Sequence, residues 1–261
     1  MRMLGKRAGV FAVVVLIGIA VSGCGANAPE RQAPAGLHGT IVVDAASSLT
    51  DSFRRLGAQF HAANPGVTVT FNFGASSALA TQIVSGAPAD VFAAANPATM
   101  KTVTDAAETS GTPTIFVRNR LEIAVPPGNP GRITGLADFA DPAKTIALCA
   151  VEVPCGAAAA TVFARAGLTP RPDTLEQDVA AALTKVELDE VDAALVYRTD
   201  VISAGDKVTG IPFPEAADAI NGYPIAALKG SGNPKAAAAF VKWVLSKHGR
   251  SLLSGAGFDL P

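Results

Sequence analysis

The sequence predicts an α/β protein of two lobes with a cleft between them. Strand-like apolar runs alternate with helix-like stripes along the mature chain, a pattern that favours mostly parallel sheets. Once an export segment and a tether are set aside, roughly 225 residues remain, which suits two compact lobes. Proline-rich breaks at 126–130 and 211–214 indicate that one lobe is inserted into the other. We expect one lobe at 38–119 and 211–261 and the inserted lobe at 120–210.

The N-terminal segment has the pattern of an export signal. Lys6 and Arg7 precede an apolar stretch, 10–21, that is too short to span a bilayer comfortably. The stretch ends in 21–24 (VSGC), which resembles a bacterial lipobox, cleaved before a cysteine that is then acylated, for example with palmitate. We therefore expect a signal peptide at 1–23 and a flexible tether at 24–37, anchored through Cys24 on the extracytoplasmic face of the cell membrane. A plain signal peptide with a chance cysteine is the alternative.

In the first third of the mature chain, each predicted strand is followed by a predicted helix. The run Ile41-Val42-Val43 is a buried strand, and the helix after it repeats apolar residues at helical spacing. Strands are expected at 40–44, 67–73 and 90–94, and helices at 48–62, 77–85 and 97–107.

The rest of the chain continues the alternation. Strands are expected at 114–117, 121–125, 145–148, 193–197 and 223–228, and helices at 136–140, 156–166, 178–187, 199–203 and 234–246. Pro234 suits the first turn of the last helix, and Gly249 marks its end.

Two serine-bearing loops lie where a strand passes into a helix. They are 45–50 (AASSLT) and 74–78 (GASSA), and neither contains Lys, Arg or His. The N-terminus of a helix offers unpaired N–H groups and a partial positive charge, so an oxyanion can bind there without a formal cation. If both loops face one cleft, they form a neutral cage of hydrogen-bond donors. The alternative is that Ser47 or Ser48 is an ordinary helix cap.

Further donors are expected from the inserted lobe. Segments 153–156 (VPCG) and 177–180 (QDVA) each run into a helix, and Tyr197 ends an apolar strand. Ligands of open α/β sheets bind at the carboxyl ends of strands, where these groups would lie. A half-buried packing role is the alternative for Tyr197.

A cage of donors favours a particular kind of ligand. A fully ionised tetrahedral dianion such as molybdate or sulfate has only acceptors, whereas a phosphate monoanion keeps a proton and needs a carboxylate. The serines have no Asp or Glu beside them, and Asp44 is the nearest acid. The net charge of −1 argues against nucleic acid as a partner, and the three histidines are too scattered for a metal site.

Cys149 and Cys155 are close in the sequence of a chain that we expect to be exported. An oxidising compartment favours a local disulfide between them, with two buried free thiols as the alternative.

These motifs, in this order, resemble the molybdate-binding lipoproteins of bacterial ABC importers. The resemblance covers nearly the whole mature chain and rests on segments 45–50, 73–77, 85–92 (SGAPADVF), 153–156, 178–179, 195–200 (LVYRTD), 240–246 and 255–258.

The resemblance implies a two-lobe periplasmic binding protein fold (type II), with mixed sheets and an ion held between the lobes. It implies no catalysis, no cofactor and no direct protein–metal bond. Its ligand would be molybdate, and tungstate as well, passed to a membrane permease with a cytoplasmic ATPase. The implied ion contacts are the hydroxyls and amides of Ser48 and Ser76, the amides of Cys155 and Val179, and the Tyr197 hydroxyl. Alanine is usual at the position of Cys155, and Ser47 competes with Ser48 for the inward position.

Three other functions compete with this one. The same fold can serve a receptor for sulfate, phosphate or an organic acid. Segment 74–78 is a near match to the nucleophile elbow of a serine hydrolase, although only His248 follows it as a candidate base. A structural lipoprotein is the third alternative.

Overall fold

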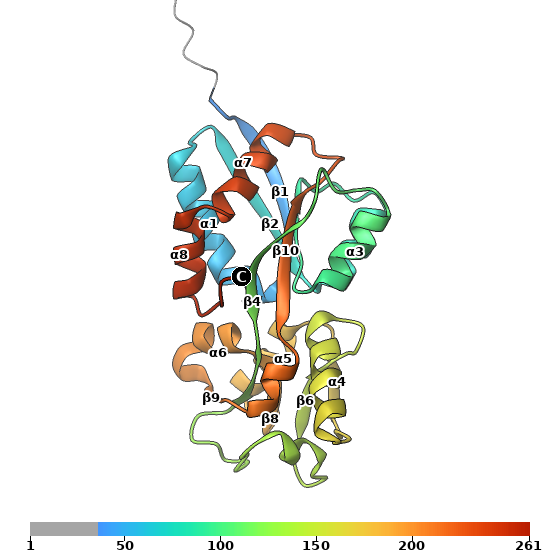
Figure 1. The fold of residues 1–261 in the computed structure, drawn as a ribbon. Coiled ribbons are helices and arrows are strands. Elements are labelled where there is room, and N and C mark those ends of the chain that lie inside the picture. The colour runs from blue at the N-terminus through green and yellow to red at the C-terminus, as the bar shows by residue number, and fades with distance from the viewer. Residues whose placement is uncertain (1–35) are drawn as a thin grey trace, which may run out of the picture. The chain divides into compact units, whose positions relative to one another are not determined.

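The computed structural model describes residues 36–261, which form two five-stranded mixed sheets (Figure 1). The expected signal peptide, the lipidation site at Cys24 and nearly all of the tether lie outside the described residues. Within the described part, no helix combines the length and apolarity that crossing a membrane requires.

The first sheet and the helices packed on it are called lobe I. Its strand order is β2-β1-β3-β10-β4, where β1, β2 and β3 run parallel and β10 is antiparallel to both of its neighbours. The strands are β1 (Gly39–Ala46), β2 (Val67–Gly74), β3 (Val91–Ala93), β4 (Thr114–Asn119) and β10 (Asn221–Ala227). The helices are the 3₁₀ helix η1 (Ser47–Leu49), α1 (Thr50–Ala63), α2 (Ser76–Val84), α3 (Pro97–Asp105), α7 (Pro234–Val244) and α8 (Lys247–Gly255).

Aromatic residues dominate the core of lobe I. Phe53 of α1 packs edge-on against Phe240 of α7 and contacts Phe116 of β4. A separate apolar cluster, which includes Leu79 and Met100, joins α2 and α3 to the sheet. Helices therefore cover both faces, which holds the strand ends of β1 and β2 in fixed positions.

The second sheet and its helices are called lobe II. Its strand order is β7-β6-β8-β5-β9, with β7, β6 and β8 parallel and β5 antiparallel to both of its neighbours. The strands are β5 (Leu121–Val125), β6 (Ile146–Cys149), β7 (Thr174–Glu176), β8 (Ala193–Tyr197) and β9 (Thr209–Ile211). The helices are α4 (Pro154–Ala166), α5 (Val179–Glu187) and α6 (Arg198–Ala204), with 3₁₀ helices η2 (Leu136–Ala140), η3 (Gly205–Lys207) and η4 (Pro214–Asp218).

The chain passes between the lobes at two points. Only Arg120 separates β4 from β5, and the return lies between η4 and β10. The expected boundary at 210/211 falls inside β9, which pairs with β5 of lobe II. The residues that follow β9 also belong to this lobe, since Phe213, Ala216 and Ala219 lie in its apolar core. The proline-rich breaks therefore lie within lobe II, not at its borders. We propose a division into 36–119 with 221–261 and 120–220.

The predicted strands and helices are present, with some differences. The sequence did not predict β7 and β9, which are three residues each and too short to show a strand period, or the 3₁₀ helices η3 and η4. Segment 136–140 is a 3₁₀ helix, not an α-helix. The expected helix at 234–246 is followed by α8, because the Ser246 hydroxyl accepts from the Gly249 amide and starts a new helix. Gly249 is inside α8, where a side chain would collide with the Val244 carbonyl.

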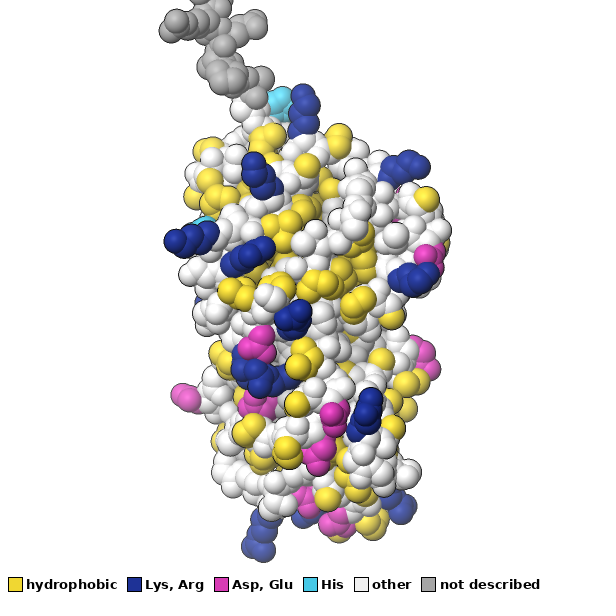
Figure 2. All heavy atoms as spheres, in the orientation of Figure 1, with side chains coloured by type: hydrophobic (Ala, Val, Ile, Leu, Met, Phe, Trp, Pro, Cys, Tyr) yellow, Lys and Arg dark blue, Asp and Glu magenta, His cyan; other side chains and the backbone are white. Residues whose placement is uncertain are grey.

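Charged side chains are dispersed over one face of the molecule. On the face shown in Figure 2, Lys and Arg side chains lie singly or beside Asp and Glu and do not form a continuous band. This distribution agrees with the near-neutral net charge.

Candidate functional site

Segments of both lobes line one small cavity. Its volume is about 10 Å³. Ser48, Ser76, Cys155, Val179 and Tyr197 all line it, so every residue that the sequence assigned to the ion is brought together. The remaining lining residues are Ala46, Ser47, Gly74, Ala75, Ala95, Val153, Pro154 and Asp178. The two lobes therefore contribute residues to the same small cavity.

The serines of the two loops are not helix caps. Neither η1 nor α1 has a side-chain cap, and α2 begins after Ala75 without one. The alternative of ordinary capping is thus wrong for Ser47, Ser48 and Ser76. Their hydroxyls remain available for other partners.

Ser76 is the most buried of the cavity-lining serines, with 1% of its surface exposed. Its Oγ accepts a hydrogen bond from the backbone N–H of Ala95, at 3.0 Å. A backbone N–H can only donate, so the hydroxyl proton of Ser76 is not used in this bond. That proton is free to donate into the cavity.

Ser48 is half-buried and contacts a tyrosine of the same lobe. Its Oγ lies 3.0 Å from the hydroxyl oxygen of Tyr223, and either group is able to donate. Ser47 also lines the cavity, and its carbonyl accepts from the Thr50 hydroxyl at 2.6 Å. Ser48 is the serine of this pair whose hydroxyl is held by a fixed side chain.

The N-terminus of α4 supplies amides from lobe II. Val153 is extended and precedes Pro154, which has no N–H, so Cys155 and Gly156 carry the first amides of the helix. Cys155 is joined to Cys149 by a disulfide, which ties the helix start to the end of β6. A side chain at position 156 would overlap the Ala150 carbonyl, so only glycine permits this close approach.

The N-terminus of α5 lies beside that of α4 along the cavity. The Asp178 carboxylate caps α5 by accepting from the Ala181 amide at 3.0 Å. Its negative charge is therefore partly offset by the helix end. The amide of Val179 belongs to the first turn, which has no intrahelical acceptor for it. Within residues 36–261, no loop or turn hydrogen bond uses the amides of Ser48, Ser76, Cys155 or Val179.

Tyr197 connects the end of β8 to the start of α6 and is 1% exposed. Its hydroxyl accepts from the side-chain amide of Asn221 at 2.6 Å, and its own amide donates to Asp200 at 2.9 Å. Burial raises the pKa of Tyr197 well above its ordinary value. The hydroxyl is therefore neutral and carries a proton.

The cavity is lined by hydrogen-bond donors, and Asp178 is the one charged residue of its lining. No Lys, Arg or His is among its lining residues in the described part of the chain, and no cluster of His, Cys, Asp and Glu suited to a metal ion occurs there. Burial raises the pKa of Asp44 to about 6, against an opposing hydrogen bond from Asn72. Burial raises the pKa of Asp200 to about 7. Neither carboxylate lines the cavity.

Four residues of the site region were missed by sequence reasoning. Ala95 follows β3 just before α3, so its place at a strand-to-helix junction is a signal that could have identified it. Tyr223, Asn119 and Asn221 lie within or at the end of strands and carry no such signal. Their proximity to the site is known only from their hydrogen bonds in the folded structure.

The serine hydrolase alternative lacks its base. His248 bonds Gln59 through Nε2 at 2.7 Å, and its ring packs on Trp243. It does not line the cavity that contains Ser76. The described residues therefore do not assemble the triad that the elbow-like motif would need.

Comparison with known proteins identifies the family of the chain. Residues 41–259 match the family model described as bacterial extracellular solute-binding protein. The molybdate-binding protein ModA of Mycobacterium tuberculosis is 40% identical over 263 residues, covering 100% of both chains.

Two solved structures share the fold. The periplasmic molybdate-binding protein of Azotobacter vinelandii superposes with a TM-score of 0.73 at 21% identity, covering 85% of this chain and 99% of that one. The sulfate-binding protein SubI of Mycobacterium tuberculosis gives a TM-score of 0.75 at 18% identity, covering 85% and 86%. The predicted two-lobe periplasmic binding protein fold is confirmed. With two lobes, a donor-lined cavity between them and a family match over nearly the whole described chain, the protein belongs to the bacterial extracellular solute-binding proteins.

Proposed function

We propose that the protein captures molybdate, and tungstate equally well, outside the cytoplasm and delivers it to the permease and ATPase of an ABC importer. The observation that carries this proposal is the cavity in which amides and hydroxyls of both lobes converge without a cationic side chain. The 40% identical relative over the full chain is a molybdate-binding protein, which supports the choice of ion.

The donor set explains why the ligand is an unprotonated oxyanion. Each hydrogen bond from a neutral donor to a charged oxygen contributes about 1.5–3 kcal/mol net. A tetrahedral dianion satisfies every such donor, because all of its oxygens accept. A hydrogen phosphate adds an O–H that needs an acceptor among these donors. The one carboxylate of the cavity lining is that of Asp178, whose Oδ1 already caps α5, so only its second oxygen would be left to accept that proton.

Size distinguishes the remaining candidates. Metal–oxygen bonds are longer than sulfur–oxygen bonds, so a cage fitted to molybdate holds sulfate loosely. Molybdate and tungstate are nearly equal in size, and the cage has no means of separating them. Sulfate and phosphate receptors on the same fold are the competing function.

Calorimetric titration with molybdate, tungstate, sulfate and phosphate tests the proposal. We expect tight binding of the first two and much weaker binding of the others. Sulfate that binds as tightly as molybdate would refute the choice of ion. A second readout is thermal unfolding, because a ligand specific for the folded state raises the melting temperature.

The membrane anchor is proposed on the lipobox alone. Cys24 follows the sequence Val21-Ser22-Gly23 and would carry the acyl groups, palmitate among them. Metabolic labelling with a palmitate analogue should label the wild-type protein and not Cys24→Ala, and the variant should be released from the membrane. Equal labelling of both proteins would contradict acylation at Cys24 and would leave the proposal of molybdate as ligand unaffected.

A further inference from the structure

The hydrogen bond between Ser48 and Tyr223 decides what Ser48 offers to a ligand. The two oxygens are 3.0 Å apart, and either hydroxyl is able to donate. If Ser48 donates to Tyr223, only its lone pairs face the cavity, and they would repel an oxyanion. If Tyr223 donates to Ser48, the Ser48 proton is left for the ligand. The direction of this bond therefore matters for affinity.

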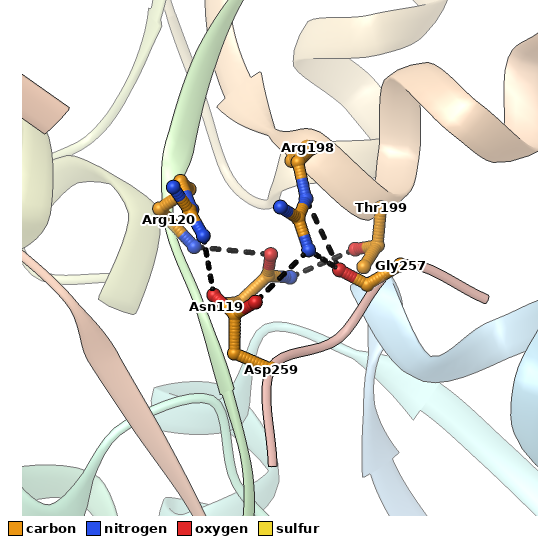
Figure 3. A network of polar contacts seen from close by, with 6 residues as sticks. All are labelled: Asn119, Arg120, Arg198, Thr199, Gly257 and Asp259. Atoms are coloured by element: carbon orange, nitrogen blue, oxygen red, sulfur yellow. Dashed lines mark hydrogen bonds and ion pairs between the residues drawn. The ribbon is translucent and has the colours of Figure 1, made fainter. Parts of the chain in front are cut away.

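Asn119, at the end of β4, fixes the direction from behind Tyr223. Its Oδ1 accepts from the Arg120 amide at 3.1 Å, which sets the orientation of the side-chain amide. Its Nδ2 then faces the Thr199 hydroxyl at 2.8 Å and the Tyr223 hydroxyl at 3.4 Å. Figure 3 shows Asn119 between Arg120 and Thr199. Because an amide nitrogen only donates, the Tyr223 hydroxyl must accept from it.

Tyr223 then has one proton of its own to place. The residue is fully buried, and burial raises its pKa well above the ordinary value, so the hydroxyl stays protonated. Two hydroxyls neighbour it, those of Ser48 and Tyr197. The Tyr197 oxygen already accepts from Asn221 at 2.6 Å. Of the two, the Ser48 oxygen is the one that makes a hydrogen bond with the Tyr223 hydroxyl within residues 36–261, at 3.0 Å, so it receives the Tyr223 proton.

We propose that Asn119 and Tyr223 form a hydrogen-bond relay that turns the proton of the Ser48 hydroxyl into the cavity. Tyr223 and Asn119 are positioning residues, because they act through Ser48 and do not line the cavity themselves. The inference rests on the proposed function, since it assigns a role toward the same bound oxyanion. Ser48 would then be a third hydroxyl whose proton is left for the ligand. The other two are Ser76, whose oxygen accepts from the Ala95 amide, and Tyr197, whose oxygen accepts from Asn221.

The start of the relay is anchored where the chain crosses between the lobes. Arg120, whose amide orients Asn119, bonds the Asp259 carboxylate through its guanidinium at 2.8 Å. Arg198, next to Thr199, bonds the Gly257 carbonyl and contacts Asp259 at 3.2 Å (Figure 3). The C-terminal segment therefore holds this crossing in place. It also holds the Arg120 amide, which orients Asn119 and, through Tyr223, the Ser48 hydroxyl.

A double-mutant cycle tests the relay. Molybdate dissociation constants are measured by calorimetry for the wild type, Tyr223→Phe, Ser48→Ala and the double variant. Tyr223→Phe should weaken binding about fivefold in the wild-type background and less than about twofold in the Ser48→Ala background, because it acts only through Ser48. A fivefold loss in both backgrounds would mean that Tyr223 only supports the fold, and no loss in either would also overturn the relay.

The phenylalanine variant keeps the packing of the ring on Phe116 and Phe258, so it tests the hydroxyl alone. Asn119→Ala, taken through the same cycle, provides a second variant if Tyr223→Phe does not fold. Thr199→Val is the matched control, because Thr199 accepts from the same amide but lies off the route to Ser48. Its affinity should stay within about twofold of the wild type.

A second readout distinguishes positioning from general loosening of the cavity. With Ser48 free to rotate, Tyr223→Phe should discriminate less between molybdate and hydrogen phosphate, measured by competition. Equal losses for both ions would contradict the relay. Failure of the wild type to bind molybdate or tungstate would refute the proposed function itself, which is a different result from an uncoupled cycle.

Discussion

Replacing Ser76 by alanine removes the most buried serine hydroxyl of the cavity. The hydroxyl of Ser76 accepts from the Ala95 amide at 3.0 Å and is proposed to donate to the ion. Ser76→Ala removes that donor and leaves the amide of Ser76 itself in place. Loss of one hydrogen bond to a charged ligand costs about 1.5–3 kcal/mol, so the molybdate dissociation constant should rise roughly 10- to 150-fold.

The same change should lower the stability of the unliganded protein. Ala95 is 3% exposed, and its N–H would lose its acceptor in a buried position. An unpaired buried donor costs about 1–3 kcal/mol, which corresponds to a fall in melting temperature of roughly 2–10 °C for a chain of this size. Affinity and stability are therefore both affected, for separate reasons.

Calorimetry and thermal unfolding measure the two effects. Ser77→Ala is the matched control, because Ser77 is the next residue of the same helix and does not line the cavity. Its affinity and melting temperature should stay near those of the wild type. If Ser76→Ala loses stability but keeps the wild-type affinity, the hydroxyl only holds Ala95 and the proposed contact is refuted.

Three further predictions concern the surroundings of the site. Gly156→Ala should weaken ion binding at least tenfold by calorimetry, because the new methyl group overlaps the Ala150 carbonyl and displaces the start of α4; unchanged affinity would contradict this. Burial raises the pKa of Asp200 to about 7, so the folded protein holds a proton that the unfolded chain releases near pH 4. Stability should therefore fall by about 1.4 kcal/mol per pH unit between roughly pH 4 and 7, and Asp200→Asn should flatten this slope in urea titrations; an unchanged slope would refute it. Asp259→Asn should cost no more than about 1 kcal/mol of unfolding free energy, and less at high salt, because its ion pairs are partly exposed; a larger, salt-independent loss would argue against an ion-pair origin.

The main elements of the site could be predicted because they recur at one kind of junction. Loops 45–50 and 74–78, the start of α4 and the start of α5 all lead from a strand or loop into a helix, and none of them contains Lys, Arg or His. Such junctions can be read from local patterns, and parallel strands bring them to one edge of each sheet. The disulfide partners were also readable, since Cys149 and Cys155 are close along the chain.

The crossing and the relay could not be predicted, for a different physical reason. Prolines at 126–130 and 211–214 mark breaks in regular structure, but they do not reveal which core the adjoining apolar residues join. Phe213 packs in lobe II, which sequence alone does not indicate. Asn119 and Tyr223 are more than a hundred residues apart in the chain, and their contact follows from the pairing of β4 with β10.

Because no cationic side chain lines the cavity, we expect affinity to depend on closure of the lobes. Without a cationic side chain, an open form would offer only the donors of one lobe, those of Ser48 and Ser76. Lobe II adds the proposed contacts of Cys155, Val179 and Tyr197, which at about 1.5–3 kcal/mol each favour the closed form by roughly 4.5–9 kcal/mol before dehydration is counted. Driving an equilibrium from 1:99 to 99:1 takes about 5.5 kcal/mol of differential binding, so three contacts from the second lobe are of the size needed. An ion that reaches only one lobe would leave the protein open, and this is why the same contacts that hold the ion would also signal its presence to a permease.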